Sequence, residues 1–152
     1  MSQYEARIAA IDPGGSGAIA WISWNGEWGL SPIPKAPRDW YELLKHLNPA
    51  KVLVEKVGFH RVGNSASSSV KFARTCGIME GFLVALSTPQ EQVVPSKWMQ
   101  GLLGAGNVPK ERAERKRAIQ AKVQMLRPAI RTTLETADAL GMLIWYEEIR
   151  AK

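Results

Sequence analysis

The sequence predicts one α/β domain, residues 1–152, built on a five-stranded mixed sheet with helices on its faces. Short apolar runs rich in β-branched residues predict the strands, and segments with apolar residues at helical spacing alternate with them. A chain of 152 residues that is 45% apolar can form one core and is too short for two ordinary domains.

Three antiparallel strands are expected at the start of the chain. Residues 7–12 and 18–24 are apolar runs separated by a turn that begins at Pro13. Asn25-Gly26 then precedes a further run over residues 27–30, a pattern typical of a type I′ hairpin.

A helix and a fourth strand follow this hairpin. Apolar residues at helical spacing predict a helix over residues 38–47, and residues 51–55 form a short apolar run that ends in Glu55. Because a helix connects the third and fourth strands, the fourth can lie parallel to the first. Asp12 and Glu55 would then end neighbouring strands at the same edge of the sheet.

A long helix is expected over residues 66–86. Ala73, Gly77 and Gly81 form a stripe of small residues along it. Such a stripe permits close backbone approach, either to the sheet or to a second subunit.

The remaining elements include a fifth strand and three helices. Residues 91–94 predict the strand, and Pro95 marks the first turn of a short helix. A basic helix is expected to start at Pro109, and a last helix with a wide apolar stripe covers residues 132–149.

Four acidic residues are placed for metal chemistry. Asp12 and Glu55 end neighbouring strands, while Glu135 and Asp138 are three apart on the predicted last helix and project from one face. An ionised carboxylate among small and apolar residues, as at Asp138, is costly unless it is paired or bound to metal. Four such carboxylates suit a two-metal site, in which ions about 4 Å apart activate a water and stabilise the leaving oxygen of a phosphodiester.

Three of these acids also have a structural interpretation that remains open at this point, and Asp138 is the hardest to explain in that way. Asp12 before Pro-Gly could accept hydrogen bonds within an Asx turn, and Glu55 could pair with a nearby lysine. Glu135 could complete a capping box with Thr132.

The composition limits the kind of metal site and the compartment. Cys76 is the single cysteine and the two histidines lie far apart, so any metal is expected to be held by oxygen ligands. No stretch approaches about 18 uninterrupted apolar residues, and the first residues lack a signal-peptide pattern. We therefore expect a cytoplasmic protein that does not enter a membrane.

The positive charge is concentrated in one segment. Residues 110–131 carry eight basic and two acidic residues, which accounts for the whole formal charge of +6. This distribution favours a binding surface for a polyanion, although a solvated helix face remains the alternative. The basic residues expected to contact DNA phosphates are Lys110, Arg112, Arg115, Lys116 and Arg117.

Four motifs occur in the order found in a known family. Ile-Asp-Pro-Gly at residues 11–14 and Val-Glu-Lys-Val at residues 54–57 look like its first two strand motifs. Residues 95–97 with 104–110 are similar to its basic DNA-contacting segment, and residues 135–140 to its final acidic helix. The chain thus resembles the RuvC-like Holliday junction resolvases of the RNase H-like superfamily, and its short length resembles a phage-type member.

This resemblance implies an RNase H-like fold, a symmetric homodimer, and Mg²⁺ or Mn²⁺, with two ions held by the four acids. The implied activity is that of a crossover junction endodeoxyribonuclease in DNA recombination and repair. Such an enzyme makes paired nicks in a four-way junction and leaves 5′-phosphate and 3′-hydroxyl ends. A branch-migration motor partner is not implied by so short a chain.

The resemblance also suggests further DNA contacts and two departures from the family pattern. Phe59 would match the aromatic residue that family members insert into the junction, and Arg61 lies in the same loop. Lys97 belongs to the similar basic segment. Lys56 stands where the family often has glutamine, and Glu135 where it often has aspartate or histidine, so occupancy of a second metal position is left open.

Two other function classes compete with a nuclease. A non-catalytic, structure-specific DNA-binding protein would keep the basic helix without turnover, but the presence of all four acids argues against it. An actin-like phosphotransferase begins with a similar Asp-x-Gly pattern, but 152 residues are too few for the two lobes that grip a nucleotide.

Overall fold

The sheet is centred on β1 (Ala6–Asp12), which pairs antiparallel with β2 (Ala18–Ser23) and parallel with β4 (Val52–Glu55). The edge strands are β3 (Trp28–Pro32) and β5 (Gln90–Val93), so the strand order is β3-β2-β1-β4-β5. This computed structural model describes residues 5–56 and 65–150. The predicted mixed sheet, with its fourth strand parallel to its first, is confirmed.

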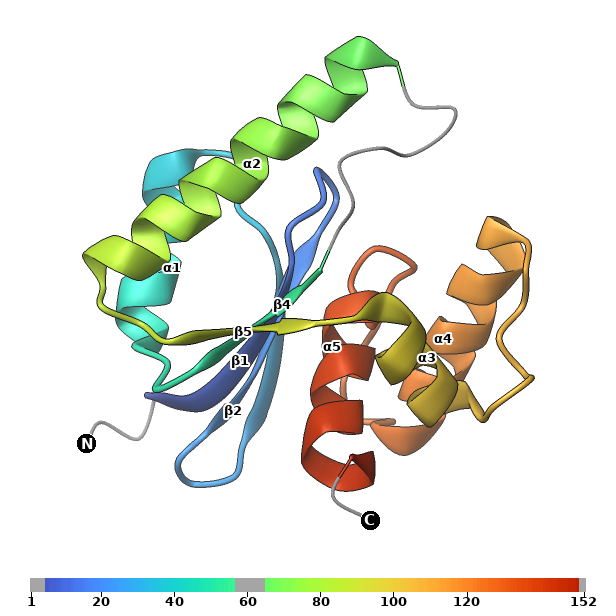
Figure 1. Ribbon diagram of the computed structural model, residues 1–152. Helices are drawn as coiled ribbons and strands as arrows, with labels where there is room; N and C mark the ends of the chain where they lie inside the picture. Colours follow the sequence, from blue (N-terminus) through green and yellow to red (C-terminus); the bar gives the residue numbers. More distant parts are fainter. Residues whose placement is uncertain (1–4, 57–64, 151–152) are drawn as a thin grey trace.

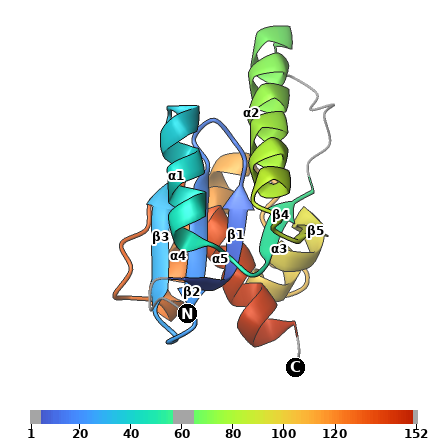
Figure 2. The same cartoon turned by 90° about the vertical axis from the view of Figure 1, so that its left-hand side faces the viewer.

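Helices cover both faces of the sheet (Figure 1). The helices α1 (Pro37–Leu47) and α2 (Ala66–Ala85) pack on one face, and Figure 2 shows them side by side there. On the other face lie α3 (Pro95–Leu103), α4 (Arg112–Leu126) and α5 (Ala137–Ile144), followed by a π-helical turn, η1 (Trp145–Ile149).

The alternation of side chains along β1 explains the two cores. Ala9 and Ile11 pack toward α1 and α2, whereas Ile8 and Ala10 pack toward α3, α4 and α5. Because Asp12 is two residues after Ala10, its side chain belongs to the face covered by α5. The carboxylate therefore lies at the end of the strand, next to the second core.

The predicted β2–β3 hairpin is confirmed, but the type I′ turn was wrong. Four residues separate the strands, and within Asn25-Gly26 only Gly26 has positive φ. A type I′ turn needs positive φ at both central residues. The Asn25 side chain instead accepts hydrogen bonds from the Ser23 hydroxyl and the Glu27 amide, which closes a longer loop.

Two helix starts also differ from the predictions. The basic helix starts at Arg112 rather than Pro109, and the last helix starts at Ala137 rather than at residue 132. Before α5, Thr133 and Thr136 exchange hydrogen bonds between hydroxyl and backbone amide. These reciprocal bonds hold a turn over residues 133–136 that precedes the helix, and the capping box predicted between Thr132 and Glu135 is not formed by that pair.

The stripe of small residues on α2 does not pack against the sheet. Ala73, Gly77 and Gly81 are exposed, and a Cβ atom added to either glycine would meet nothing within 4 Å. Val70 and Val84, on the same side of the helix, are 68% and 73% exposed. Close approach to the sheet is therefore excluded as the reason for this stripe.

A polar cluster fixes the end of the chain to the edge of the sheet. Lys51, Tyr146 and Arg150 all bind the carboxylate of Glu91 on β5. These hydrogen bonds, the one from Lys51 foremost, lower the pKa of Glu91 to about 2.

Across the described part of the chain, no helix combines the length and apolar content needed to cross a membrane.

Candidate active site

Asp12 is held at the end of β1 by the turn that follows it. Its Oδ1 accepts a hydrogen bond from the Gly14 amide at 3.2 Å, and the Gly17 amide closes the turn on the Gly14 carbonyl at 2.8 Å. A Cβ atom at Gly17 would lie 1.9 Å from the Asp12 carbonyl oxygen, so only glycine fits there. The Asx interpretation is thus realised, and it also fixes the position of the carboxylate.

Glu55 lies beside Asp12 because β1 and β4 are parallel and in register. Ile11 pairs with Val54, so the next residue of each strand, Asp12 and Glu55, comes at the same edge of the sheet. Glu55 is only 7% exposed. Its Oε1 accepts a hydrogen bond at 3.0 Å from the indole nitrogen of Trp98, which is fully buried.

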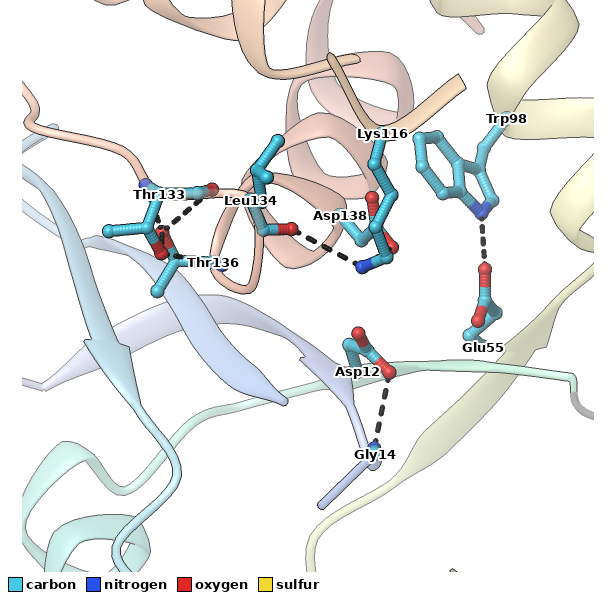
Figure 3. Close-up of polar contacts among 9 residues, drawn as sticks. All are labelled: Asp12, Gly14, Glu55, Trp98, Lys116, Thr133, Leu134, Thr136 and Asp138. Carbon is cyan, nitrogen blue, oxygen red and sulfur yellow. Dashed lines mark hydrogen bonds and ion pairs between the residues drawn. The ribbon is translucent and has the colours of Figure 1, made fainter. Parts of the chain in front are cut away.

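Asp138 faces these two acids from α5 (Figure 3). The ammonium group of Lys116, from α4, lies 3.3 Å from Oδ2 of Asp138 and 3.2 Å from the Leu134 carbonyl oxygen. The Asp138 side chain is 14% exposed, and its Oδ1 is buried without a hydrogen-bond partner. Asp138 therefore carries one paired and one unsatisfied oxygen.

Glu135 is placed differently from the other three acids. It is exposed and lies in the turn before α5. The prediction that Glu135 and Asp138 share one face of a regular helix was therefore wrong. A hydrogen bond with the Thr133 side chain lowers the pKa of Glu135, with a smaller contribution from the charge of Lys116. Lys116 is thus the cation that interacts with both acids of this segment.

The donor set fits a divalent cation in chemistry but not in spacing. Carboxylate oxygens are the ligands that Mg²⁺ and Mn²⁺ prefer, and the unsatisfied Oδ1 of Asp138 is an acceptor that a cation would satisfy. Within residues 5–56 and 65–150, however, no three Asp, Glu, His or Cys side chains lie close enough together to hold a metal ion. The cation beside Asp138 in this arrangement is the ammonium group of Lys116.

The predicted DNA contacts fall into two groups. Lys97, Lys110, Arg112 and Arg117 are exposed on α3, on α4 and on the segment before α4. Arg115 instead donates to the carbonyl oxygens of Pro109 and Lys110, and Lys116 is engaged at Asp138. Phe59 and Arg61 lie outside the described residues.

Sequence reasoning missed Trp98 as a partner of the site. No sequence pattern identifies this partner, because it depends on the parallel pairing of β5 with β4, in which Val93 pairs with Glu55 and α3 starts two residues after Val93. The indole of Trp98, in the first turn of α3, is thereby brought next to Glu55. Trp98 is both a core residue and the hydrogen-bond donor to Glu55.

Cys76 is excluded as a nucleophile by its surroundings. It lies on the buried side of α2, and burial raises the pKa of its thiol, with further contributions from the charges of Glu80 and Asp12. A thiol that remains protonated is a poor nucleophile, and Cys76 is a buried residue of the core.

The architecture is that of the RNase H-like α/β class, in which a five-stranded mixed sheet carries acids at the ends of two neighbouring strands. Comparison with solved structures identifies a particular protein with a similar fold. The chain is similar to RuvC of Thermus thermophilus, with 18% identity and a TM-score of 0.60 over 89% of both chains.

A second structure of the same protein, T. thermophilus RuvC in complex with a Holliday junction substrate, is 20% identical. The match has a TM-score of 0.63 and covers 89% of this chain and 88% of that chain. No protein-family model matches the sequence. The protein thus has a RuvC-like fold, as the resemblance of its motifs implied.

Proposed function

We propose that this protein is a metal-dependent, structure-specific endonuclease that resolves four-way DNA junctions by paired, symmetric nicks. The observation that carries the proposal is the parallel register of β1 and β4 within a RuvC-like fold. It places Asp12 and Glu55 at one edge of the sheet, facing Asp138 of α5. The related RuvC structure with a Holliday junction supports branched DNA as the substrate.

Different residues position each of the proposed metal ligands. The turn after β1 holds Asp12, the indole of Trp98 orients Glu55, and α5 presents Asp138. A divalent cation bound by these carboxylates would activate a water and stabilise the leaving oxygen of the phosphodiester. With Glu135 exposed in its turn, we assign the primary ligand role to Asp12, Glu55 and Asp138, and an outer role to Glu135.

The exposed basic residues at the start of α4 would bind the phosphate backbone. Lys110, Arg112 and Arg117 have their charges at the surface, and Lys97 lies near the start of α3. Such contacts position DNA without reading its sequence, which suits recognition of a branched shape.

A homodimer would match the symmetry of the substrate. A four-way junction has two equivalent strands to cut, and a two-fold dimer presents two identical sites. The exposed face of α2, with its small residues between Val70 and Val84, supports a helix-to-helix contact between two copies.

A second candidate is a structure-specific DNA-binding protein of the same fold without turnover. The observation in its favour is that the described acids form no three-ligand group, while Lys116 already neutralises Asp138. The two candidates differ in one measurable property, which is metal-dependent nicking.

The experiment is a cleavage assay on junction, fork, flap and linear duplex DNA, with Mg²⁺ or Mn²⁺. Metal chemistry contributes several kcal/mol to such reactions, so Asp138→Asn should lower the nicking rate by about a hundredfold or more, with junction binding within a few-fold. Asp39→Asn, an exposed acid on α1, is the matched control and should keep full activity. An Asp138→Asn variant with half of the wild-type rate would refute the site, and wild-type binding without nicking would favour the second candidate.

A further inference from the structure

Lys116 contacts negative groups of the protein itself, unlike the exposed basic residues of α4. Its ammonium group contacts a carboxylate oxygen of Asp138 and the carbonyl oxygen of Leu134, and its charge also lowers the pKa of Glu135. The side chain is 28% exposed, so most of it is withdrawn from solvent. Lys116 therefore serves as the resident cation at the start of α5.

Asp138 depends on this cation in the arrangement described. A carboxylate that is mostly buried requires a counter-charge, and its second oxygen, Oδ1, has no partner. Lys116 supplies the counter-charge at Oδ2 of Asp138 but leaves Oδ1 without a hydrogen-bond partner. A divalent cation would offer twice the charge and would satisfy Oδ1, so the two cations compete for one carboxylate.

We propose that Lys116 is an intramolecular competitor of the catalytic metal: it neutralises Asp138 when no metal is bound, and metal binding displaces it. This inference deepens the proposed function, on which it rests for the identity of the ligand. Lys116 is thus a positioning residue, which controls the charge and availability of Asp138.

The proposal couples metal binding to DNA binding. Lys116 lies on α4 next to Arg117, which is exposed on the basic surface. Once displaced from Asp138, its ammonium group is available to a DNA phosphate. Metal and DNA then strengthen each other's binding, because each favours the same released state of Lys116.

The first test measures Mn²⁺ affinity in the absence of DNA, by electron paramagnetic resonance of free Mn²⁺ and by calorimetry. Lys116→Gln should bind Mn²⁺ roughly tenfold more tightly than wild type, since it removes a positive charge from the site. Lys116→Arg retains the charge and should stay near wild type. Lys122→Gln, the same substitution elsewhere on α4, removes an equal charge away from Asp138 and should leave the affinity unchanged.

A thermal measurement on the same variants separates this effect from unfolding. Without metal, Lys116→Gln should melt below wild type, because Asp138 loses its counter-charge. Added Mn²⁺ should raise the melting temperature of this variant by more than that of wild type, as tighter binding requires. Equal Mn²⁺ affinities of Lys116→Gln, Lys122→Gln and wild type would overturn the proposal.

A second test uses the unaltered protein, so that it stands even if Lys116→Gln does not fold. Acetylation of lysines by acetic anhydride is measured by mass spectrometry with and without Mg²⁺. Labelling of Lys116 should rise several-fold when Mg²⁺ is added, while labelling of Lys122 stays constant. Labelling of Lys116 that is unaffected by saturating Mg²⁺ would also overturn the proposal.

Neither test depends on cleavage, so the outcomes of the two proposals can be told apart. A wild-type protein that binds metal as described but does not nick junctions would refute the endonuclease and leave the role of Lys116 intact. A protein that nicks junctions, with Mn²⁺ affinity insensitive to Lys116→Gln, would refute the role of Lys116 alone.

Discussion

Two buried tryptophans allow the hydrogen bond to Glu55 to be measured separately from packing. The indole nitrogen of Trp98 donates to Glu55, whereas the indole nitrogen of Trp40 is buried and has no partner. The two side chains are 0% and 2% exposed, so replacement by phenylalanine removes similar apolar contacts from both. The substitutions Trp98→Phe and Trp40→Phe therefore form a matched pair.

The expected difference in stability follows from the hydrogen bonds alone. A hydrogen bond to a charged group contributes about 1.5–3 kcal/mol, and Trp98→Phe loses one. Trp40→Phe instead removes an unsatisfied buried donor, which relieves about 1–3 kcal/mol of desolvation cost. Trp98→Phe should thus unfold with a free energy at least about 2 kcal/mol below that of Trp40→Phe.

The assay is urea and thermal unfolding of both variants. In a chain of this size, 1 kcal/mol shifts the midpoint by roughly 2–4 °C, so Trp98→Phe should melt at least about 4 °C below Trp40→Phe. Because Trp98 orients a proposed metal ligand, junction nicking by Trp98→Phe should also fall by about 10–100-fold. Equal midpoints for the two variants would refute the claim that the indole of Trp98 supports Glu55.

Three further predictions concern the turn at Asp12, the basic surface and the exposed face of α2. Gly17→Ala should cost about 1–3 kcal/mol of stability, because its Cβ meets backbone, whereas Gly15→Ala, with nothing within 4 Å, should change stability by less than about 0.5 kcal/mol. Replacement of three exposed basic residues by alanine should flatten the slope of log junction affinity against log salt by up to about 3, and an unchanged slope would show that they face away from DNA. These residues are Lys110, Arg112 and Arg117. Gly77→Arg fits the monomer and should abolish a dimer detected by sedimentation, while Gly77→Ala should preserve it; a dimeric, folded Gly77→Arg variant would exclude α2 as the interface.

Local patterns along the chain were sufficient to predict the strands and the position of β4 beside β1, but not the place of β5 in the sheet. Apolar runs of strand length and the helix after the third strand predicted that β4 lies parallel to β1. This pairing places Asp12 and Glu55 at one edge, and it is confirmed by the pairing of Ile11 with Val54. Backbone geometry alone determines this part of the site, since parallel strands in register end together.

The helix starts and the turn type were less well predicted. The reason is that several neighbouring polar side chains can each hydrogen-bond to the same backbone amides. Asn25 forms an Asx turn rather than serving as the first residue of a type I′ turn. Thr133 and Thr136 hydrogen-bond to each other in the turn before α5, and Glu135 lies in that turn instead of on a helix face with Asp138. Such competition is decided by small differences in free energy that neighbouring tertiary contacts can reverse.

The partners of the acids were decided by tertiary structure alone. The basic segment and Asp138 were both evident in the sequence, but their residue types do not specify which cation meets which carboxylate. The packing of α4 against α5 brings Lys116 to Asp138, and the position of α3 beside β4 brings Trp98 to Glu55. Sequence therefore determined which acids lie at the sheet edge, whereas the packing of helices from distant segments determined the charge and hydrogen bonding that control them.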